Sequence, residues 1–381
     1  MRIAIVCYPT FGGSGVVATE LGMELSKKGH EIHFITYKQP VRLEQLTRNI
    51  QFHEVNVPEY PLFQFQPYEL ALSSKLVNMV KLYKIEVLHV HYAIPHAYAG
   101  YMAKKMLEEE GIFIPMVTTL HGTDITLVGN HPFYKPAVTF SINNSDVVTS
   151  VSESLKEDTL NLFNITKEIH VVPNFIDVGN YLKNFTDCQR SLMADDDELI
   201  ISHISNFRAV KRIPDVIKIF EIICREKKAK LIMIGDGPER GKAEDLVYSM
   251  GIQDQVLFVG QSNEVDKILC FSDLFLLPSE KESFGLAALE AMVNSVPVIS
   301  TNTGGLPEVN IHGVSGYLSD VGNVEEMGKN ALLILKDAET LNRFKEGARE
   351  QAKIYDIHKV VPLYERLYEL AISKIRKGVK S

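Results

Sequence analysis

The sequence predicts an α/β protein made of two consecutive doubly wound domains, each a parallel sheet with helices on both faces. Short runs of β-branched and aliphatic residues alternate with helical segments along the chain, which is the pattern of buried parallel strands. A Pro/Asn break at VVPNFID (171–177) interrupts the alternation, which then starts again. We therefore expect one domain over residues 1–172 and a second over 173–356, facing each other across a cleft.

Each expected strand is short, apolar and bounded by turn residues. In the first domain the strands are expected at RIAIVCY, EIHFIT, VLHVHY, MVTTLHG and DVVTSVS, with helices over 16–29, 69–83 and 95–110. In the second they are expected at LIISHIS, AKLIMIGDG, VLFVG, DLFLLPS and VPVIS, with a helix over 212–228 after the first. No strand follows the last helical stretch, so the C-terminal segment 357–381 is expected to pack back on the first domain.

Composition restricts the partners and the compartment. The net charge of -8 and pI of about 5.9 argue against nucleic acid as the main partner, because polyanion binding needs a basic surface. The chain enters a strand at once, without a cationic leader, and has no run long enough to span a membrane. We expect a cytoplasmic protein with no stable membrane association. The four cysteines form no CxxC pair, which favours reduced thiols over a disulfide framework or zinc site.

A glycine-rich turn follows the first strand. FGGSGVVA places Gly13-x-Gly15-x-x-Ala18 at the start of a helix, where backbone N–H groups favour anions. A dinucleotide site would also need an acid at the end of the second strand, but that strand ends FITYKQ. This weakens the hypothesis of an NAD-linked oxidoreductase. We favour an anion or carboxylate site at Gly13, Ser14 and Gly15 over a tight turn without a ligand.

Two cations follow the first strand of the second domain. Arg208 and Lys211, in SNFRAVKR, come where a strand ends and a helix begins. The helix macrodipole disfavours cations at that place, so their position needs a reason. Arg can bind a diphosphate through its bidentate fork and Lys as a point charge. We favour a phosphate site over a solvated helical turn.

Residues 282–290 read ESFGLAALE and contain two carboxylates. Ser283 is expected to cap the helix, which leaves Glu282 in the loop and puts Glu290 about two turns inside, roughly 10–12 Å along the axis. Glu290 would lie beside the apolar stripe without a cationic neighbour, which is costly unless a distant group binds it. The pair therefore fits two ligand contacts better than an acid/base couple, although an exposed acid at the stripe's edge remains the alternative.

At these residues the chain resembles the glycosyltransferases of family 4, which have the GT-B fold. The resemblance lies in Glu282-x7-Glu290, the upstream Arg208 and Lys211, and the motifs HGTD (121–124), GGSG (12–15), PNFID and GDGPE (235–239), and it covers the whole chain. CYPTFGGSGVVATELG, HVHYAIPHAYAGYMAK, TLHGTDIT and ISNFRAVKR resemble the members that join N-acetylglucosamine from UDP-N-acetylglucosamine to L-malate, the first step of bacillithiol biosynthesis.

The resemblance implies a retaining transferase without a metal or other cofactor. Arg208 and Lys211 would stabilise the departing diphosphate, Glu282 would hold a sugar hydroxyl, Glu290 the ribose hydroxyls, and His121 the sugar near its reacting face. The implied nucleotide-sugar site is Gly13, Gly15, Asn206, Arg208, Lys211, Gln261, Glu282, Ser283, Phe284, Gly285 and Glu290. The implied catalytic residues are Arg208, Lys211, His121 and Glu282, and the implied acceptor site is Ser14, Tyr92, Thr119 and His121.

The resemblance further implies attack on the face that the diphosphate leaves, with a phosphate oxygen taking the malate proton. Neither glutamate suits the nucleophile role of a retaining glycosidase, and no protein base is evident. His89 and His91 alternate along a strand and are expected to point to opposite faces, so that they cannot share a metal. Another acceptor, an oxidoreductase and a non-catalytic sugar-binding module remain alternatives, and a homo-oligomer is possible.

Overall fold

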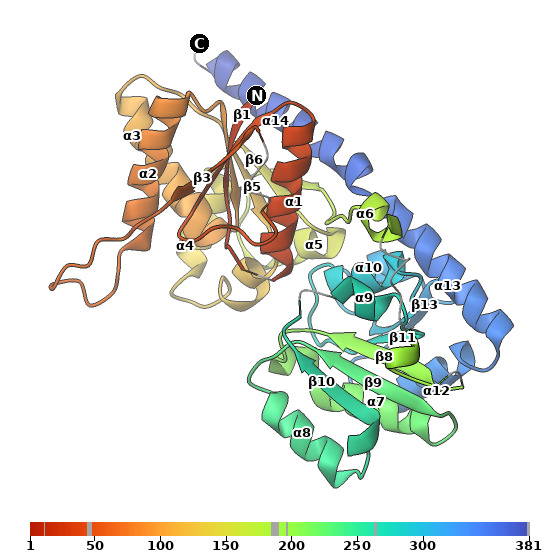
Figure 1. Ribbon diagram of the computed structural model, residues 1–381. Helices are drawn as coiled ribbons and strands as arrows, with labels where there is room; N and C mark the ends of the chain where they lie inside the picture. Colours follow the sequence, from red (N-terminus) through yellow and green to blue (C-terminus); the bar gives the residue numbers. More distant parts are fainter. Residues whose placement is uncertain (11, 44–47, 184–189, 196, 263–264, 379–381) are drawn as a thin grey trace. The chain divides into compact units, whose positions relative to one another are not determined.

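The structure is a computed structural model that describes the chain except residues 11, 44–47, 184–189, 196, 263–264 and 379–381. The chain divides into two compact units (Figure 1), the first formed by Met1–Asn174 with Ile357–Ser381 and the second by Phe175–Asp356. Each unit contains one parallel sheet with helices around it. The prediction of two doubly wound α/β domains is confirmed.

The first unit has a seven-stranded sheet in the order β3-β2-β1-β4-β5-β6-β7. Every neighbouring pair is parallel. The strands are β1 (Arg2–Val6), β2 (Glu31–Thr36), β3 (Ile50–Glu54), β4 (Val87–His91), β5 (Met116–Leu120), β6 (Val147–Ser150) and β7 (Ile169–Val171). The chain winds outward from β1 to β3 and then returns to the other side of β1 at β4. The switch point, where loops diverge and ligands bind in such sheets, therefore lies between β1 and β4.

Helices cover the sheet of the first unit, and its central strands are buried on both faces. In β4 and β5 every residue is buried, as expected of strands between two helical layers. The helices are α1 (Gly13–Lys27), α2 (Tyr68–Tyr83), α3 (Tyr98–Glu109), α4 (Lys135–Asn143), α5 (Glu153–Leu162) and α14 (Ile357–Gly378), with short turns η1 (Ala93–Ala97) and η2 (Thr123–Leu127). The C-terminal α14 buries Tyr364 and Tyr368 in this unit.

The second unit has a six-stranded parallel sheet in the order β10-β9-β8-β11-β12-β13. Its strands are β8 (Leu199–Ile204), β9 (Ala229–Ile234), β10 (Val256–Gly260), β11 (Leu274–Leu277), β12 (Val298–Thr301) and β13 (Gly316–Ser319). Its helices are α6 (Val178–Lys183), α7 (Ile213–Cys224), α8 (Arg240–Ser249), α9 (Val265–Leu269), α10 (Leu286–Val293), α11 (Leu306–Val309), α12 (Val324–Ile334) and α13 (Ala338–Ala352). Short turns are η4 (Arg190–Leu192), η5 (Ala209–Lys211), η6 (Gln253–Gln255) and η7 (Lys353–Tyr355). The switch point lies between β8 and β11.

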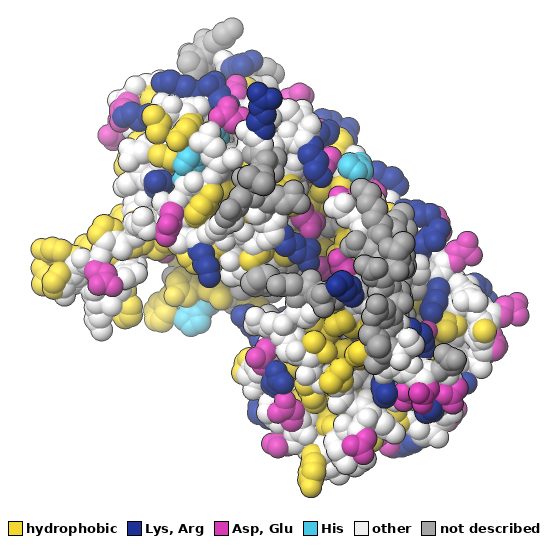
Figure 2. Space-filling view, in the orientation of Figure 1, with side chains coloured by type: hydrophobic (Ala, Val, Ile, Leu, Met, Phe, Trp, Pro, Cys, Tyr) yellow, Lys and Arg dark blue, Asp and Glu magenta, His cyan; other side chains and the backbone are white. Residues whose placement is uncertain are grey.

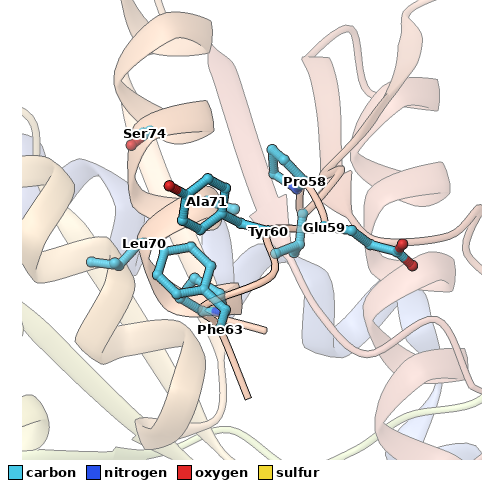
Figure 3. Close-up of a pocket in the computed structure, with 9 residues that line it drawn as sticks. Pro58, Glu59, Tyr60, Phe63, Leu70, Ala71 and Ser74 are labelled. Carbon is cyan, nitrogen blue, oxygen red and sulfur yellow. The ribbon is translucent and has the colours of Figure 1, made fainter. Parts of the chain in front are cut away.

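An apolar loop leaves the first unit between β3 and α2 (Figure 1), and its yellow side chains stand out in Figure 2. Leu62 and Phe65 are each 82% exposed there. At the base of the loop, a groove of about 480 Å³ is lined by residues of the loop and of α2. Figure 3 shows Tyr60 and Phe63 beside Leu70, with the Glu59 carboxylate pointing away from them. None of the residues lining this groove is a candidate site residue.

The structure bears on the redox state of the cysteines and on the presence of membrane-spanning helices. Cys7 and Cys224 are free thiols, but Cys270 is disulfide-bonded, so the expectation of reduced cysteines is wrong at Cys270. The fourth cysteine, Cys188, lies outside the described residues. In the part of the chain that the structure describes, no helix is both long and apolar enough to cross a bilayer.

Candidate active site

The first cluster of candidate residues lies in the second unit, in the loop that follows β8. Phe207 is buried and has a left-handed backbone, with φ of 35°. This anchored residue separates two neighbours, Asn206 and Arg208, whose side chains are both exposed. The Arg208 guanidinium forms no ion pair with any residue that the structure describes. An unpaired, exposed guanidinium at the carboxyl end of a central strand is available to an anion.

Lys211 contacts a carboxylate that lies far away in the sequence. Its Nζ donates to Oε2 of Glu282 at 2.5 Å, and the two side chains are only 19% and 17% exposed. The backbones of the two loops are joined as well, since the Glu280 N–H donates to the Val210 carbonyl at 2.8 Å. The structure thus brings together the cationic loop after β8 and the acidic loop after β11, which are the neighbouring strands at the switch point.

The acidic segment begins its helix later than expected. Helix α10 starts at Leu286, and the residue before it is Gly285 with φ of 103°, so the prediction that Ser283 caps the helix is wrong. Glu290 is therefore the fifth helical residue, about one turn inside rather than two. Phe284 is buried edge-on against Tyr355, with ring centroids 5.4 Å apart, and this contact fixes the turn.

Glycines that are not among the predicted site residues hold both loops in place. A Cβ on Gly304, whose φ is 56°, would lie 1.9 Å from the Glu282 carbonyl oxygen, and one on Gly305 would lie 2.5 Å from that of Ser283. The Gly305 N–H also donates to the Glu282 carbonyl at 2.9 Å. A Cβ added to Gly237, in GDGPE, would lie 2.2 Å from the Asn206 carbonyl oxygen. The cationic and acidic loops are thus each backed by glycine-only backbone contacts.

Gln261 is not brought into this cluster. It is exposed and follows β10, which β9 separates from β8 in the sheet. Two strand spacings place it about 10 Å to the side of the cationic loop. Gln261 therefore lies apart from Arg208, Lys211 and Glu282.

In the first unit the glycine turn leads directly into α1. Gly15 needs to be glycine because a Cβ there would lie 2.3 Å from the Thr10 carbonyl oxygen and 2.7 Å from that of Tyr8. Its N–H donates to the Gly12 carbonyl at 3.0 Å, so Gly15 shapes the turn and does not offer a donor. The N–H groups of Gly13 and Ser14 have no acceptor among the described residues. Both N–H groups belong to the first turn of α1, at the positive end of the helix.

Ser14 and Tyr92 meet across the switch point of this unit. The Ser14 Oγ and the Tyr92 OH are 2.6 Å apart, which joins the turn after β1 to the turn after β4. Tyr92 has a φ of 82°, a conformation that an L-residue adopts only when its surroundings impose it. Its ring lies 5.0 Å from that of His121, which follows β5. Three of the predicted acceptor residues therefore lie together.

His121 is held by a second imidazole and by a carboxylate. Its Nε2 is 2.8 Å from Nδ1 of His91, and burial lowers the pKa of His121 to about 3. The Asp124 carboxylate accepts from the backbone N–H groups of His121 at 3.2 Å and Gly122 at 3.0 Å. A neutral imidazole at pH 7 can donate or accept a hydrogen bond, but it is a weak base.

Thr119 and His89 lie beneath this cluster. Thr119 is fully buried, and its Oγ1 contacts His89 Nε2 at 2.8 Å and Thr149 Oγ1 at 2.7 Å, so it supports the site from within. His89 and His91 do not point to opposite faces as predicted. Residues two apart on a strand share a face, and the two ring centroids are 4.4 Å apart. Among the described residues, no group of three or more His, Cys, Asp or Glu side chains is placed to hold a metal ion.

Comparison with known sequences identifies relatives along almost the whole chain. The model of Glycosyltransferase Family 4 matches residues 11–180, and that of Glycosyl transferases group 1 matches residues 185–351. The chain is 48% identical over 370 residues to the N-acetyl-alpha-D-glucosaminyl L-malate synthase of Bacillus anthracis, covering 97% of this chain and 96% of that protein. It is 25% identical to the 2-deoxystreptamine N-acetyl-D-glucosaminyltransferase of Niallia circulans, covering 96% of this chain and 100% of that protein.

Solved structures of similar fold match over the full length. Anabaena HepE in complex with UDP and glucose superposes with a TM-score of 0.80 at 17% identity, covering 97% of this chain and 99% of that one. Sucrose-phosphate synthase from Thermosynechococcus elongatus superposes with a TM-score of 0.79 at 18% identity, covering 98% and 99%. At these identities the matches establish the fold, which is GT-B.

Proposed function

The chain belongs to glycosyltransferase family 4, and on that premise we propose that it transfers N-acetylglucosamine from UDP-N-acetylglucosamine to the hydroxyl of L-malate. This is the first step of bacillithiol biosynthesis. The observation that carries the proposal is the 48% identity, over 97% of the chain, to the L-malate synthase of Bacillus anthracis. The chain is therefore a hexosyltransferase, and the oxidoreductase hypothesis is abandoned. As part of this proposal, we place the enzyme in the cytoplasm.

The second unit supplies the donor site in this proposal. Arg208, which pairs with no carboxylate among the described residues, takes the diphosphate through its bidentate fork, and Lys211 adds a point charge from the same loop. Negative charge grows on the diphosphate as the bond to the sugar breaks. Two fixed cations beside it can therefore supply several kcal/mol of stabilisation that increases towards the transition state.

The acidic loop holds the rest of the donor. In the described chain, the N–H groups of Phe284 and Gly285 have no acceptor, which makes them available to a phosphate or sugar oxygen. Glu282 accepts a hydrogen bond from a sugar hydroxyl while it holds Lys211 at 2.5 Å. Glu290, one turn into α10, accepts from the ribose hydroxyls. Both glutamates therefore bind the donor, and neither transfers a proton.

The first unit supplies the acceptor site. The N–H groups of Gly13 and Ser14, at the positive end of α1, are suited to a carboxylate of malate. The Tyr92 hydroxyl, already bonded to Ser14, and the neutral His121 imidazole provide further hydrogen bonds to the substrates. Thr119 acts indirectly, because its hydroxyl is buried and bonded to His89 and Thr149.

Retention follows from the chemistry of the substrates. The donor carries an α-linked diphosphate, and the relative from Bacillus anthracis is named for an α-glucosaminyl product. A malate hydroxyl that attacks on the face the diphosphate leaves would give that product, and the leaving phosphate oxygen takes the hydroxyl proton. Diphosphate is a good leaving group, so the step needs no protein acid.

Release of UDP from UDP-N-acetylglucosamine tests the proposal directly. We expect rapid release with L-malate and only slow hydrolysis with succinate, which keeps both carboxylates but lacks the hydroxyl that attacks. Product analysis should show an α-linked glycoside. Equal release with malate, succinate and buffer alone, from folded protein that binds UDP, would exclude L-malate as the acceptor.

A further inference from the structure

A buried carboxylate joins the two turns that carry the proposed acceptor residues. Asp124 is 2% exposed. Its Oδ2 accepts from the Ala93 N–H at 2.8 Å, in the turn after β4. Its Oδ1 accepts from the N–H groups of Gly122 at 3.0 Å and His121 at 3.2 Å, in the turn after β5. Both oxygens act as acceptors, which is the pattern of an ionised carboxylate.

The bond to Ala93 controls the direction of Tyr92. The Tyr92 N–H donates to the Thr119 carbonyl at 2.8 Å, so this residue still belongs to the ladder between β4 and β5. The next N–H, that of Ala93, turns inward to Asp124. Between these two fixed groups the backbone of Tyr92 takes a φ of 82°. An L-residue holds such a conformation only where its neighbours over-determine it.

This backbone geometry places the Tyr92 hydroxyl 2.6 Å from Ser14 Oγ. On its other oxygen the same carboxylate fixes His121, whose ring lies 5.0 Å from that of Tyr92. Asp124 itself is locked in position, because Gly129 packs so closely that a Cβ there would lie 1.7 Å from the Asp124 carbonyl oxygen. One side chain thus connects the positions of both groups that face the acceptor.

We propose that Asp124 is a positioning residue of the acceptor site, which fixes the Tyr92 hydroxyl and the His121 imidazole relative to each other. The proposal rests on the acceptor roles proposed above for Ser14, Tyr92 and His121. It assigns Asp124 no contact with substrate. Its removal should therefore change the use of malate while leaving the donor site, in residues 175–356, intact.

The test is Asp124→Asn. The amide nitrogen of asparagine cannot accept a hydrogen bond. In either orientation of the amide, the backbone N–H groups of one of the two turns lose their acceptor and face the amide NH₂, which is itself a donor. We expect the KM for malate to rise, or kcat to fall, by about ten- to a hundred-fold. Affinity for UDP, measured by calorimetry, should change by less than about two-fold, because the residues proposed to bind UDP lie in the second unit. Asp158→Asn, a half-buried carboxylate on α5 of the same unit, is the matched control and should change neither.

Two further measurements separate positioning from a general loss of structure. In a Tyr92→Phe background, Asp124→Asn should lower kcat/KM for malate by a smaller factor than in the parent enzyme, because part of its effect depends on the Tyr92 hydroxyl. Asp124→Glu, which keeps both acceptors, should recover part of the malate activity. A folded Asp124→Asn variant with parental malate kinetics would overturn the proposal, as would additive losses with Tyr92→Phe.

Amide hydrogen exchange keeps the proposal independent of the substrate assignment. The N–H groups of Ala93, His121 and Gly122 should exchange faster in Asp124→Asn than in the parent, and those of α10 should not. If the parent enzyme releases no UDP with malate, the proposed function fails while this measurement still decides whether Asp124 joins the two turns. Unchanged exchange at all three amides would refute that connection.

Discussion

Replacing Gly304 by alanine should damage the donor site through the backbone alone. Gly304 has a φ of 56°, and a Cβ would lie 1.9 Å from the Glu282 carbonyl oxygen, whereas real Cβ atoms stay beyond 3.0 Å. The carbonyl must therefore move by about 1 Å. That movement breaks its 2.9 Å bond from the Gly305 N–H and shifts the carboxylate that holds Lys211.

The chain offers a matched control for this substitution. Gly251 has a similar φ of 71°, but nothing lies within 4 Å of its Cβ position. Both alanine variants bear the left-handed conformational cost of about 1–2 kcal/mol. Gly304→Ala adds an overpacking cost of about 1–3 kcal/mol, giving a total of roughly 2–5 kcal/mol.

Urea denaturation and UDP release distinguish the two effects. Gly251→Ala should lower the free energy of unfolding by about 1–2 kcal/mol and leave kcat/KM unchanged. Gly304→Ala should lower that free energy more. It should also reduce kcat/KM about a hundred-fold, because a displacement of about 1 Å in a positioning group can lower the reaction rate by that factor. Equal destabilisation by the two substitutions, with full activity in both, would refute the steric argument.

Three further predictions concern charge, pH and helix capping. Lys211→Ala should reduce kcat by about 10²–10³, whereas the exposed Lys218→Ala should leave it unchanged, as steady-state kinetics would show. Burial lowers the pKa of His203 to about 4, so its neutral form stabilises the fold above pH 6.5, and that contribution is lost as pH falls towards 4. Urea titrations at pH 7 and pH 5 test this. Between those pH values, the free energy of unfolding should fall by roughly 2 kcal/mol less in His203→Asn than in the parent. Equal decreases in the two proteins would contradict this. Ser152 accepts from the Leu155 N–H at 3.0 Å as the N-cap of α5, and Ser152→Ala should lower the free energy of unfolding by about 1 kcal/mol, with no change in kcat/KM.

The sequence predicted the central strands of each sheet and the edge strand β10, but it missed the other three edge strands. The expected strands include β1, β4 and β5, in which nearly every residue is buried because helices cover the sheet. The strands β3, β7 and β13 were not predicted, and each lies at the edge of its sheet. In β3 no residue is fully buried. An edge strand is covered by fewer neighbouring residues than a central strand. Its sequence is therefore less uniformly apolar and is harder to recognise as a strand.

The start of α10 shows tertiary packing overriding a local signal. Ser283 has the chemistry of an N-cap, but the helix begins three residues later. Gly304 and Gly305 press against the backbone of Glu282 and Ser283, and Phe284 is held by Tyr355. These contacts come from residues 22 to 71 positions away in the sequence, so no local pattern contains them. By contrast, the error at His89 and His91 was avoidable, because the two-residue period of a strand already places them on one face.

The pairing of Lys211 with Glu282 explains how two cations can stand ready for a diphosphate. Without a ligand, Lys211 and Arg208 would repel each other in the same loop. Glu282 neutralises the less exposed one, at 2.5 Å, and leaves Arg208 as the exposed charge that an incoming anion meets first. Because a carboxylate has two oxygens, Glu282 can keep Lys211 on one and accept a sugar hydroxyl on the other. In the proposed reaction the same residue thus positions the cation and the sugar together, so the charge that forms on the diphosphate meets a lysine already in place.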